Sequence, residues 1–174
     1  MSYQLKDLYS PAFYERFSGV LEKTLPDFNK QKFIRLIFDK DWDARELKDR
    51  LWHTSIVMNQ FFPDDFEKAG SLILTVVETL HADNFTEASL EFMFLPDYVE
   101  RYGLDHFDVS VKVFEELTIF TSCEFAVRPF IVKYPDKMMK IVEAWSRHGN
   151  EHVRRLASEG SRSRLPWAMA LPEF

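Results

Sequence analysis

Two pairs of oppositely charged side chains, Glu124 with Arg128 and Arg155 with Glu159, could do chemistry in this chain. The members of each pair are four residues apart, so on a helix they lie on one face, where a carboxylate and a guanidinium can meet. Such a pair is either a surface ion pair, worth roughly a few tenths of a kcal/mol, or a means of presenting charge to a ligand. Spacing alone favours the surface ion pair.

The distribution of charge favours a ligand. The chain has 174 residues and a net charge of −6, but residues 1–127 carry −10 while residues 128–167 carry +5. Both pairs, together with Arg154, Arg162 and Arg164, belong to or adjoin this basic segment. A local excess of positive charge in an acidic protein is typical of a surface with one anion-binding face, as nucleic-acid binding requires. The alternative is a solvated basic helix face.

The segment 151–160 is predicted to be a helix with two functional faces. Asn150 can cap its first turn, and Arg155 and Glu159 project away from the apolar residues. The apolar stripe that we expect to pack inward is Val153, Leu156, Ala157 and Gly160.

The residues after this helix are predicted to form a connector. Gly160 is expected to end the helix, and Arg162 and Arg164 then reach out from a loop. The residue before Pro166 is pushed towards an extended conformation, which brings Trp167 to the start of the next element.

The fold class predicted for the whole chain is all-α. Seventeen Phe, four Trp and six Tyr against five Gly and eight Pro favour long packed elements over a turn-rich sandwich. Apolar residues recur at helical spacing, with proline and glycine as punctuation. Helices are expected over residues 11–24, 27–39, 46–62, 64–81, 86–95, 107–121, 122–134, 135–147 and 151–160.

The helices arrive in pairs with short connections, which favours stacked antiparallel pairs in a HEAT-like α-solenoid over a four-helix bundle. We expect residues 1–174 to form one such array, although no 40-residue self-similarity is present. The inner helices of a solenoid line a concave surface, so this architecture would offer a binding face.

Several classes of protein are excluded or disfavoured. A single Cys123 excludes an intramolecular disulfide, and no targeting segment is evident at the start, so a reducing, cytoplasmic setting is expected. The longest apolar runs, such as 73–77, are far too short for a membrane span. No Cys/His spacing supports a metal site, so neither a metal nor a cofactor is expected.

Four sequence blocks resemble the AlkC branch of the HEAT-like-repeat DNA glycosylases, bacterial enzymes that excise alkylated bases. They are Cys-Glu-Phe-Ala-Val-Arg-Pro-Phe at 123–130, Ala-Trp at 144–145, His-Val-Arg-Arg-Leu-Ala-Ser-Glu-Gly at 152–160 and Arg-Leu-Pro-Trp at 164–167. The resemblance is close over 107–167 and looser over 1–106. It implies an α-solenoid that binds alkylated duplex DNA on a basic concave face, in a nucleoid-associated bacterial protein.

The resemblance also implies an activity, hydrolysis of the N-glycosidic bond of 3-methylcytosine, 1-methyladenine or 3-methyladenine. Glu124 and Glu159 match active-site carboxylates of the family, Arg155 matches its arginine and Trp167 its aromatic residue. Carboxylates suit this reaction because they stabilise positive charge on the sugar, and a tryptophan can hold a cationic base. The residues expected to contact DNA are Arg128, His152, Arg154, Arg162 and Arg164.

Two features depart from the family pattern. Ser163 stands where the family usually has proline, and family members continue beyond residue 174 through repeats that add a catalytic aspartate. The chain is therefore expected to be the N-terminal part of a longer array. We expect apolar surface to be left uncovered near Trp167, Met169 and Leu171, with self-association as one consequence.

Two alternatives to a glycosylase stay open at this point. One is a non-catalytic HEAT-like module that binds DNA or protein, and the other is a helical scaffold whose basic segment is only a solvated edge.

Overall fold

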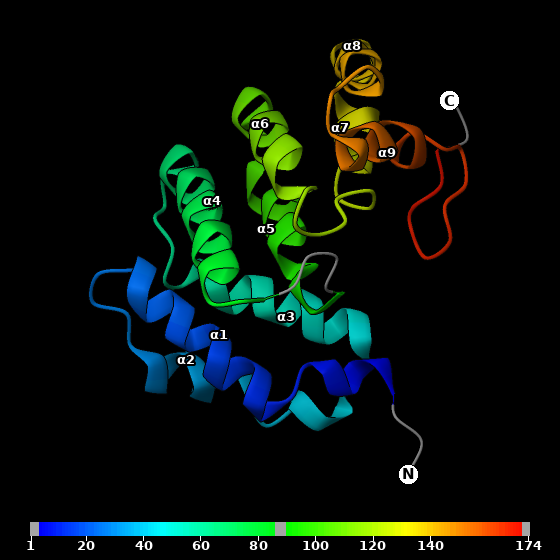
Figure 1. Cartoon of the computed structure of the whole chain (residues 1–174). Helices are drawn as coiled ribbons and strands as arrows, with labels where there is room; N and C mark the ends of the chain where they lie inside the picture. Colours follow the sequence, from blue (N-terminus) through cyan, green and yellow to red (C-terminus); the bar gives the residue numbers. More distant parts are fainter. Residues whose placement is uncertain (1–3, 86–89, 172–174) are drawn as a thin grey trace. The chain divides into compact units, whose positions relative to one another are not determined.

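The computed structural model describes residues 4–85 and 90–171, and within these ranges the regular secondary structure is helical, with no β-strand (Figure 1). The all-α prediction is therefore confirmed. The chain divides into two compact units, Met1–Phe85 and Thr86–Phe174, each of which is considered by itself. Whether residues 1–174 act as one array stays a prediction.

The first unit holds α1 against both α2 and α4, and α2 in turn packs on α3. Its core is aromatic: Tyr14, Phe17 and Phe33 are fully buried, and the ring of Phe33 lies about 6 Å from each of the other two. The elements are η1 (Leu5–Leu8), α1 (Pro11–Thr24), α2 (Lys30–Ile37), η2 (Trp42–Ala44), α3 (Leu47–Asn59) and α4 (Phe66–Ala82).

Capping side chains set the starts of α1, α2 and α4. The hydroxyl of Ser10 accepts from the N–H of Phe13 at 3.2 Å, and Pro11 follows as the first helical residue. Asn29 accepts from the N–H of Lys32 at 2.8 Å, so α2 begins three residues later than the predicted start of 27. Asp65 caps α4 in the same way.

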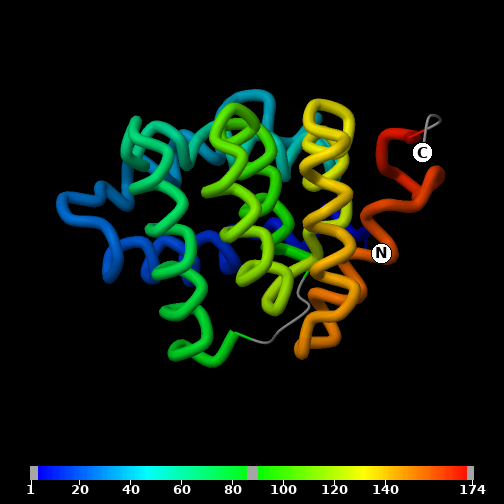
Figure 2. Tube along the Cα trace, turned by 90° about the horizontal axis from the view of Figure 1, so that it is seen from above, coloured from blue at the N-terminus to red at the C-terminus, as the bar shows by residue number. Residues whose placement is uncertain are grey.

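The second unit stacks α5 on α6, α7 on α8 and α8 on α9, and these neighbours run side by side in Figure 2. Large buried side chains fill the space between them, Phe114, Phe130 and Trp145 among them. The elements are η3 (Leu90–Phe92), α5 (Phe94–Gly103), α6 (Phe107–Leu117), α7 (Arg128–Lys133), α8 (Pro135–Ser146) and α9 (Glu151–Gly160).

Two predicted helices differ from the structure. The helix predicted over 86–95 falls partly on 86–89, outside the described residues, and α5 instead runs from Phe94 to Gly103. The predicted helix ended just before Pro96, but Pro96 lies in the first turn of α5, where no backbone donor is needed. The helix predicted over 122–134 is only α7. Residues 122–127 lie outside it, with a turn at 124–127, and Pro129 lies in the first turn of α7 rather than kinking a longer helix.

None of the helices within residues 4–85 and 90–171 has the length and apolar character that crossing a membrane would need.

Candidate nucleic-acid interface

Helix α9 is the element that carries most of the predicted site, and its bounds agree with the predicted helix over 151–160. The side chain of Asn150 accepts from the N–H of His152 at 2.8 Å, which confirms the predicted cap. The stripe Val153, Leu156, Ala157 and Gly160 is buried, as predicted.

Gly160 is the last residue of α9, and glycine is needed there for a reason that the sequence did not suggest. Its φ is not positive, so it does not serve as a left-handed cap. A Cβ at this position would lie 2.8 Å from Cγ2 of Val127, closer than packed atoms approach. Glycine is therefore needed because the end of α9 lies directly on the turn that holds residues 122–127.

Glu124 lies in that turn and is buried, with 4% of its surface exposed. Its Oε1 lies 3.3 Å from Nη2 of Arg155 on α9, and its Oε2 accepts a hydrogen bond from the hydroxyl of Ser122. Ser122 thus holds the carboxylate and does not cap a helix. Because the Arg155 side chain is 63% exposed, the pair joins a buried anion to a cation that solvent reaches.

Arg128 does not occupy the place that the sequence suggested. It is fully buried and donates hydrogen bonds to four backbone carbonyl oxygens, those of Gly160, Arg162, Ser163 and Met169. It is therefore not placed to contact DNA, and the pairing expected between Glu124 and Arg128 is replaced by pairing with Arg155. Burial lowers the pKa of its guanidinium, although an arginine still stays charged.

Glu159 projects from α9 one turn after Arg155 and is partly buried. Its Oε2 lies 3.1 Å from Nη1 of Arg162, in the residues that follow the helix. Arg155 and Glu159 thus have separate partners, one in the turn before α7 and one beyond the end of α9.

Residues 161–171, which we call the C-terminal segment, fold back on themselves. The N–H of Leu171 donates to the carbonyl oxygen of Ser163 at 2.9 Å, and the Leu171 side chain is fully buried. Between these two points Trp167 is 67% exposed and has a φ of 68°, a left-handed conformation that is rare for a bulky residue. Met169 is also exposed, so two of the three residues expected to lie uncovered do so; self-association stays a prediction.

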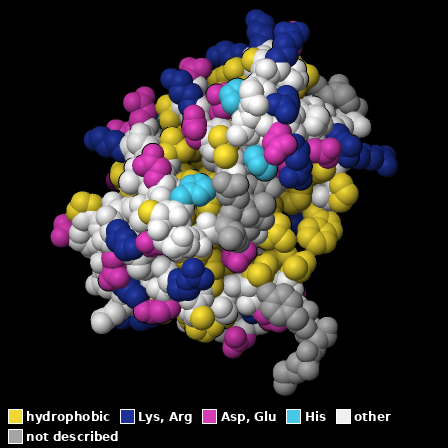
Figure 3. All heavy atoms as spheres, viewed as in Figure 1, with side chains coloured by type: hydrophobic (Ala, Val, Ile, Leu, Met, Phe, Trp, Pro, Cys, Tyr) yellow, Lys and Arg dark blue, Asp and Glu magenta, His cyan; other side chains and the backbone are white. Residues whose placement is uncertain are grey.

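The basic side chains gather over α8 and α9, interleaved with acidic ones (Figure 3). Arg154 donates two hydrogen bonds of 2.8 Å to the carbonyl oxygens of His148 and Gly149, so it steadies the turn between the two helices. His152 is half-buried, whereas Arg162 and Arg164 are exposed. Within the part of the chain that the structure describes, Arg164 has no ion-pair partner.

The structure thus brings together Glu124, Arg155, Glu159 and Arg162 on one side of α9 and its two flanking segments. No group of three or more His, Cys, Asp or Glu side chains suited to a metal ion occurs within the described ranges. Cys123, beside Glu124, is buried, and burial raises the pKa of its thiol far above the usual value. It is therefore unsuited to act as a nucleophile.

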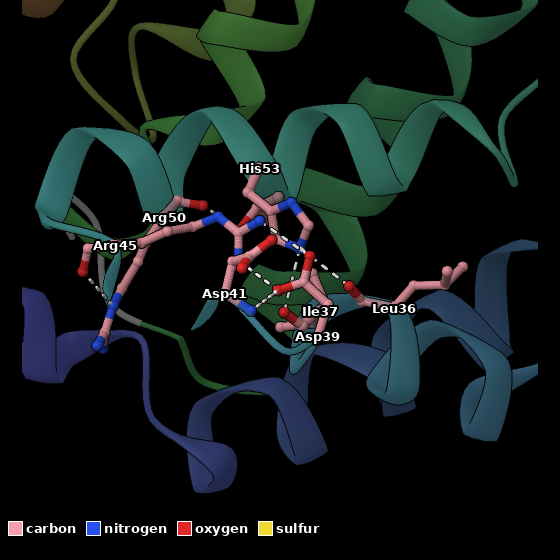
Figure 4. A network of polar contacts seen from close by, with 8 residues as sticks. Leu36, Ile37, Asp39, Asp41, Arg45, Arg50 and His53 are labelled. Carbon is pink, nitrogen blue, oxygen red and sulfur yellow. Dashed lines mark hydrogen bonds and ion pairs between the residues drawn. The ribbon is translucent and has the colours of Figure 1, made fainter. Parts of the chain in front are cut away.

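A second cluster of polar groups lies in the first unit, around Asp39 (Figure 4). The carboxylate of Asp39 accepts two hydrogen bonds from Arg45, at 2.5 and 2.9 Å, and one from the N–H of Asp41 at 3.0 Å. Nε2 of His53 lies 2.9 Å from the carbonyl oxygen of Leu36. These acceptors are filled by the protein itself, which indicates a structural cluster.

No protein-family model matches this chain. Pseudomonas fluorescens alkylpurine DNA glycosylase AlkC, solved bound to DNA containing an abasic site analog, superposes with a TM-score of 0.89 and 29% identity over 99% of the chain. In sequence and fold this chain is similar to AlkC. The helical secondary structure and this match to a helical solenoid confirm the predicted fold class.

The AlkC-like chain is also 39% identical, over 168 residues, to the uncharacterized protein YhaZ of Bacillus subtilis (strain 168). It spans about half of each protein, 45% of YhaZ and 46% of the solved AlkC chain.

Proposed function

We propose that the AlkC-like chain forms part of a DNA repair glycosylase that acts at the bacterial nucleoid on cationic alkylated bases. The substrate class is 3-methylcytosine, 1-methyladenine and 3-methyladenine in duplex DNA. One observation supports this most: the buried carboxylate of Glu124 is held 3.3 Å from the solvent-accessible Arg155, on a chain that resembles a DNA-bound AlkC.

The proposed reaction breaks the bond between C1′ of the sugar and the nitrogen of the base. A base that carries a positive charge leaves as a neutral molecule, so little help is needed at the base itself. The demanding step is the development of positive charge on the sugar, which preorganised carboxylates stabilise. We assign this role to Glu124 and Glu159. A water molecule then forms the new bond to C1′, and its proton passes to a carboxylate or to solvent.

The remaining residues are assigned to binding. The exposed ring of Trp167 can hold the cationic base by a cation–π contact, worth about 0.5–2 kcal/mol depending on desolvation. Arg162 and Arg164 are exposed and are assigned to phosphate groups, as are Arg154 and His152 on α9. Such contacts position DNA without reading its sequence, which suits an enzyme that must find damage anywhere.

The test measures release of 3-methylcytosine and 3-methyladenine from alkylated duplex DNA. It compares this chain with a longer protein that contains it, each as wild type and with Glu159→Gln. Glu151→Gln is the matched control, because Glu151 lies exposed in the first turn of the same helix. We expect release by the longer protein, and a loss of about a hundredfold or more with Glu159→Gln alone.

Two outcomes would contradict this proposal. If the longer protein binds DNA but releases no base, the chain is a non-catalytic DNA-binding module. If Glu159→Gln is as active as the control, the carboxylate role assigned to Glu159 is wrong.

A further inference from the structure

We propose that Arg128 is a positioning residue, which holds the C-terminal segment in the form that presents Arg162, Arg164 and Trp167. The anchoring of the segment stands independently of any activity. Its consequence for DNA rests on the proposed function.

The contacts of Arg128 support this role. Its Nε donates to the carbonyl oxygen of Met169 at 2.6 Å, and its Nη1 donates at 2.8 Å to those of Gly160 and Arg162. Its Nη2 reaches the carbonyl oxygen of Ser163 at 3.4 Å. One planar group with five fixed donors therefore joins the end of α9 to both limbs of the segment, which a lysine ammonium could not reproduce.

The C-terminal segment is also fixed at points that do not involve Arg128. The hydrogen bond between Leu171 and Ser163 closes it, and the buried side chain of Leu171 seats its far end. At its near end, Gly160 lies directly on Val127. A left-handed conformation such as that of Trp167 persists only where the surroundings impose it. The fixed ends and the central guanidinium supply that constraint.

The first test needs no DNA. Trypsin cleaves after arginine, so Arg162 and Arg164 report directly on the freedom of the segment. We expect Arg128→Lys to speed cleavage at these two sites about tenfold, as when local opening becomes easier by roughly one charge-assisted hydrogen bond. Cleavage at sites in the first unit should not change.

The matched control is Arg50→Lys. Arg50 is also buried and also donates to backbone carbonyl oxygens, those of Arg45 and Lys6, but it lies in the first unit. It should leave cleavage at Arg162 and Arg164 unchanged. A merely structural Arg128 would lower the melting temperature and leave these two sites as resistant as in the wild type, which would overturn the proposal.

A measurement on the wild-type protein covers the case in which the Arg128 variant does not fold. In hydrogen exchange, the N–H of Leu171 should be protected to a degree comparable with the amides of α9, because its bond to Ser163 exists only in the anchored segment. Exchange of Leu171 at the rate of an unstructured peptide would refute the anchoring.

A third measurement separates this inference from the proposed function. Well below its melting temperature, the Arg128→Lys protein should bind alkylated duplex DNA about tenfold more weakly, because the phosphate-contacting arginines lose their fixed position. Faster cleavage with unchanged DNA affinity would leave the anchor intact and remove the C-terminal segment from the DNA interface. Unchanged cleavage with weaker binding would contradict the anchor itself.

Discussion

The two units of this chain use the same residue types in opposite ways. Each buries an arginine that donates to backbone carbonyl oxygens, Arg50 in the first unit and Arg128 in the second. Each also sets a carboxylate nearby, Asp39 in one and Glu124 in the other. The difference lies in what remains open to solvent and to a ligand.

In the first unit, Asp39 is held by two hydrogen bonds from Arg45, which is itself mostly buried, and by a backbone N–H. In the second unit, Glu124 is buried but its cationic partner Arg155 is 63% exposed. In the Asp39 cluster the donors and acceptors are matched by the protein's own groups, so the cluster stabilises the fold. A buried charge that pairs with an exposed one leaves that partner free to meet a ligand, and this distinction marks the candidate site.

The largest predicted effect is a difference in base-release rate between variants of the two carboxylates, Glu124 and Asp39. Glu124→Gln is expected to lower single-turnover base release by a longer protein containing this chain about a hundredfold or more, because it removes a preorganised charge. Asp39→Asn should leave that rate unchanged at a temperature where both variants are folded. Equal losses in the two variants would show that the contrast between the units has no catalytic meaning.

A smaller effect concerns the arginines of the two units. Arg164→Glu should weaken binding of duplex DNA about tenfold and reduce the dependence of affinity on salt by about one or two phosphate contacts. Arg35→Glu is the matched variant, since Arg35 is an exposed arginine on α2. If both variants lose affinity equally, the basic surface extends over both units.

The pH dependence of stability should also have opposite signs in the two units. Burial raises the pKa of Glu100 to about 7 from the ordinary 4.5, with repulsion from Asp97 adding to it. The folded state thus binds this proton more readily than the unfolded state, so the stabilisation is present below about pH 4.5 and is lost as pH rises through 7. Glu100→Gln should raise the free energy of unfolding by about 1–3 kcal/mol at pH 8 and change it little at pH 4.

For Asp39, the hydrogen bond from Arg45 lowers the pKa below the ordinary 3.8. Its stabilisation is therefore present above that value and is lost as pH falls through the lowered pKa. Asp39→Asn should destabilise the protein at pH 7 and have little effect in strong acid. Thermal unfolding of both variants across this pH range provides the check, and shifts of the same sign would contradict it.

The smallest effect is expected at Trp167. Trp167→Gly should change the free energy of unfolding by no more than about 1 kcal/mol, because relief of the left-handed strain offsets the entropy that glycine adds to the unfolded chain. Trp42→Ala should cost about 3–5 kcal/mol, since Trp42 is buried beneath the Arg50 guanidinium. Chemical denaturation measures both. A large loss at Trp167 would place that ring in the core.

Features that depend on neighbouring residues were predictable from the sequence. The bounds of α9, its Asn150 cap and its buried stripe follow from spacing and from a capping side chain, and all were confirmed. The partner of Glu124 was not predictable, because it is chosen by the packing of a turn against a helix that lies about thirty residues further on. The role of Arg128 was also not predictable. Its acceptors are backbone oxygens, which leave no trace in the pattern of side chains.

Helix α5 was missed because the general rule that proline interrupts a helix does not hold at Pro96. Proline interrupts a helix in its interior but not in its first turn, and only the structure shows that Pro96 lies in the first turn. One residue in the sequence could have indicated the close packing at the end of α9. A Gly at 160 with no turn to make indicates a close approach to another segment, here the turn around Val127.

The anchor at Arg128 has a consequence for how this protein could change over generations. Its four acceptors are main-chain oxygens, which every amino acid supplies. The hydrogen bonds that hold the C-terminal segment therefore do not depend on which side chains that segment carries. Substitutions at Arg162, Arg164 or Trp167 can therefore alter what the segment touches without detaching it. The same anchor would hold a segment with different contact residues, so the binding contacts of this short stretch can be changed by substitution.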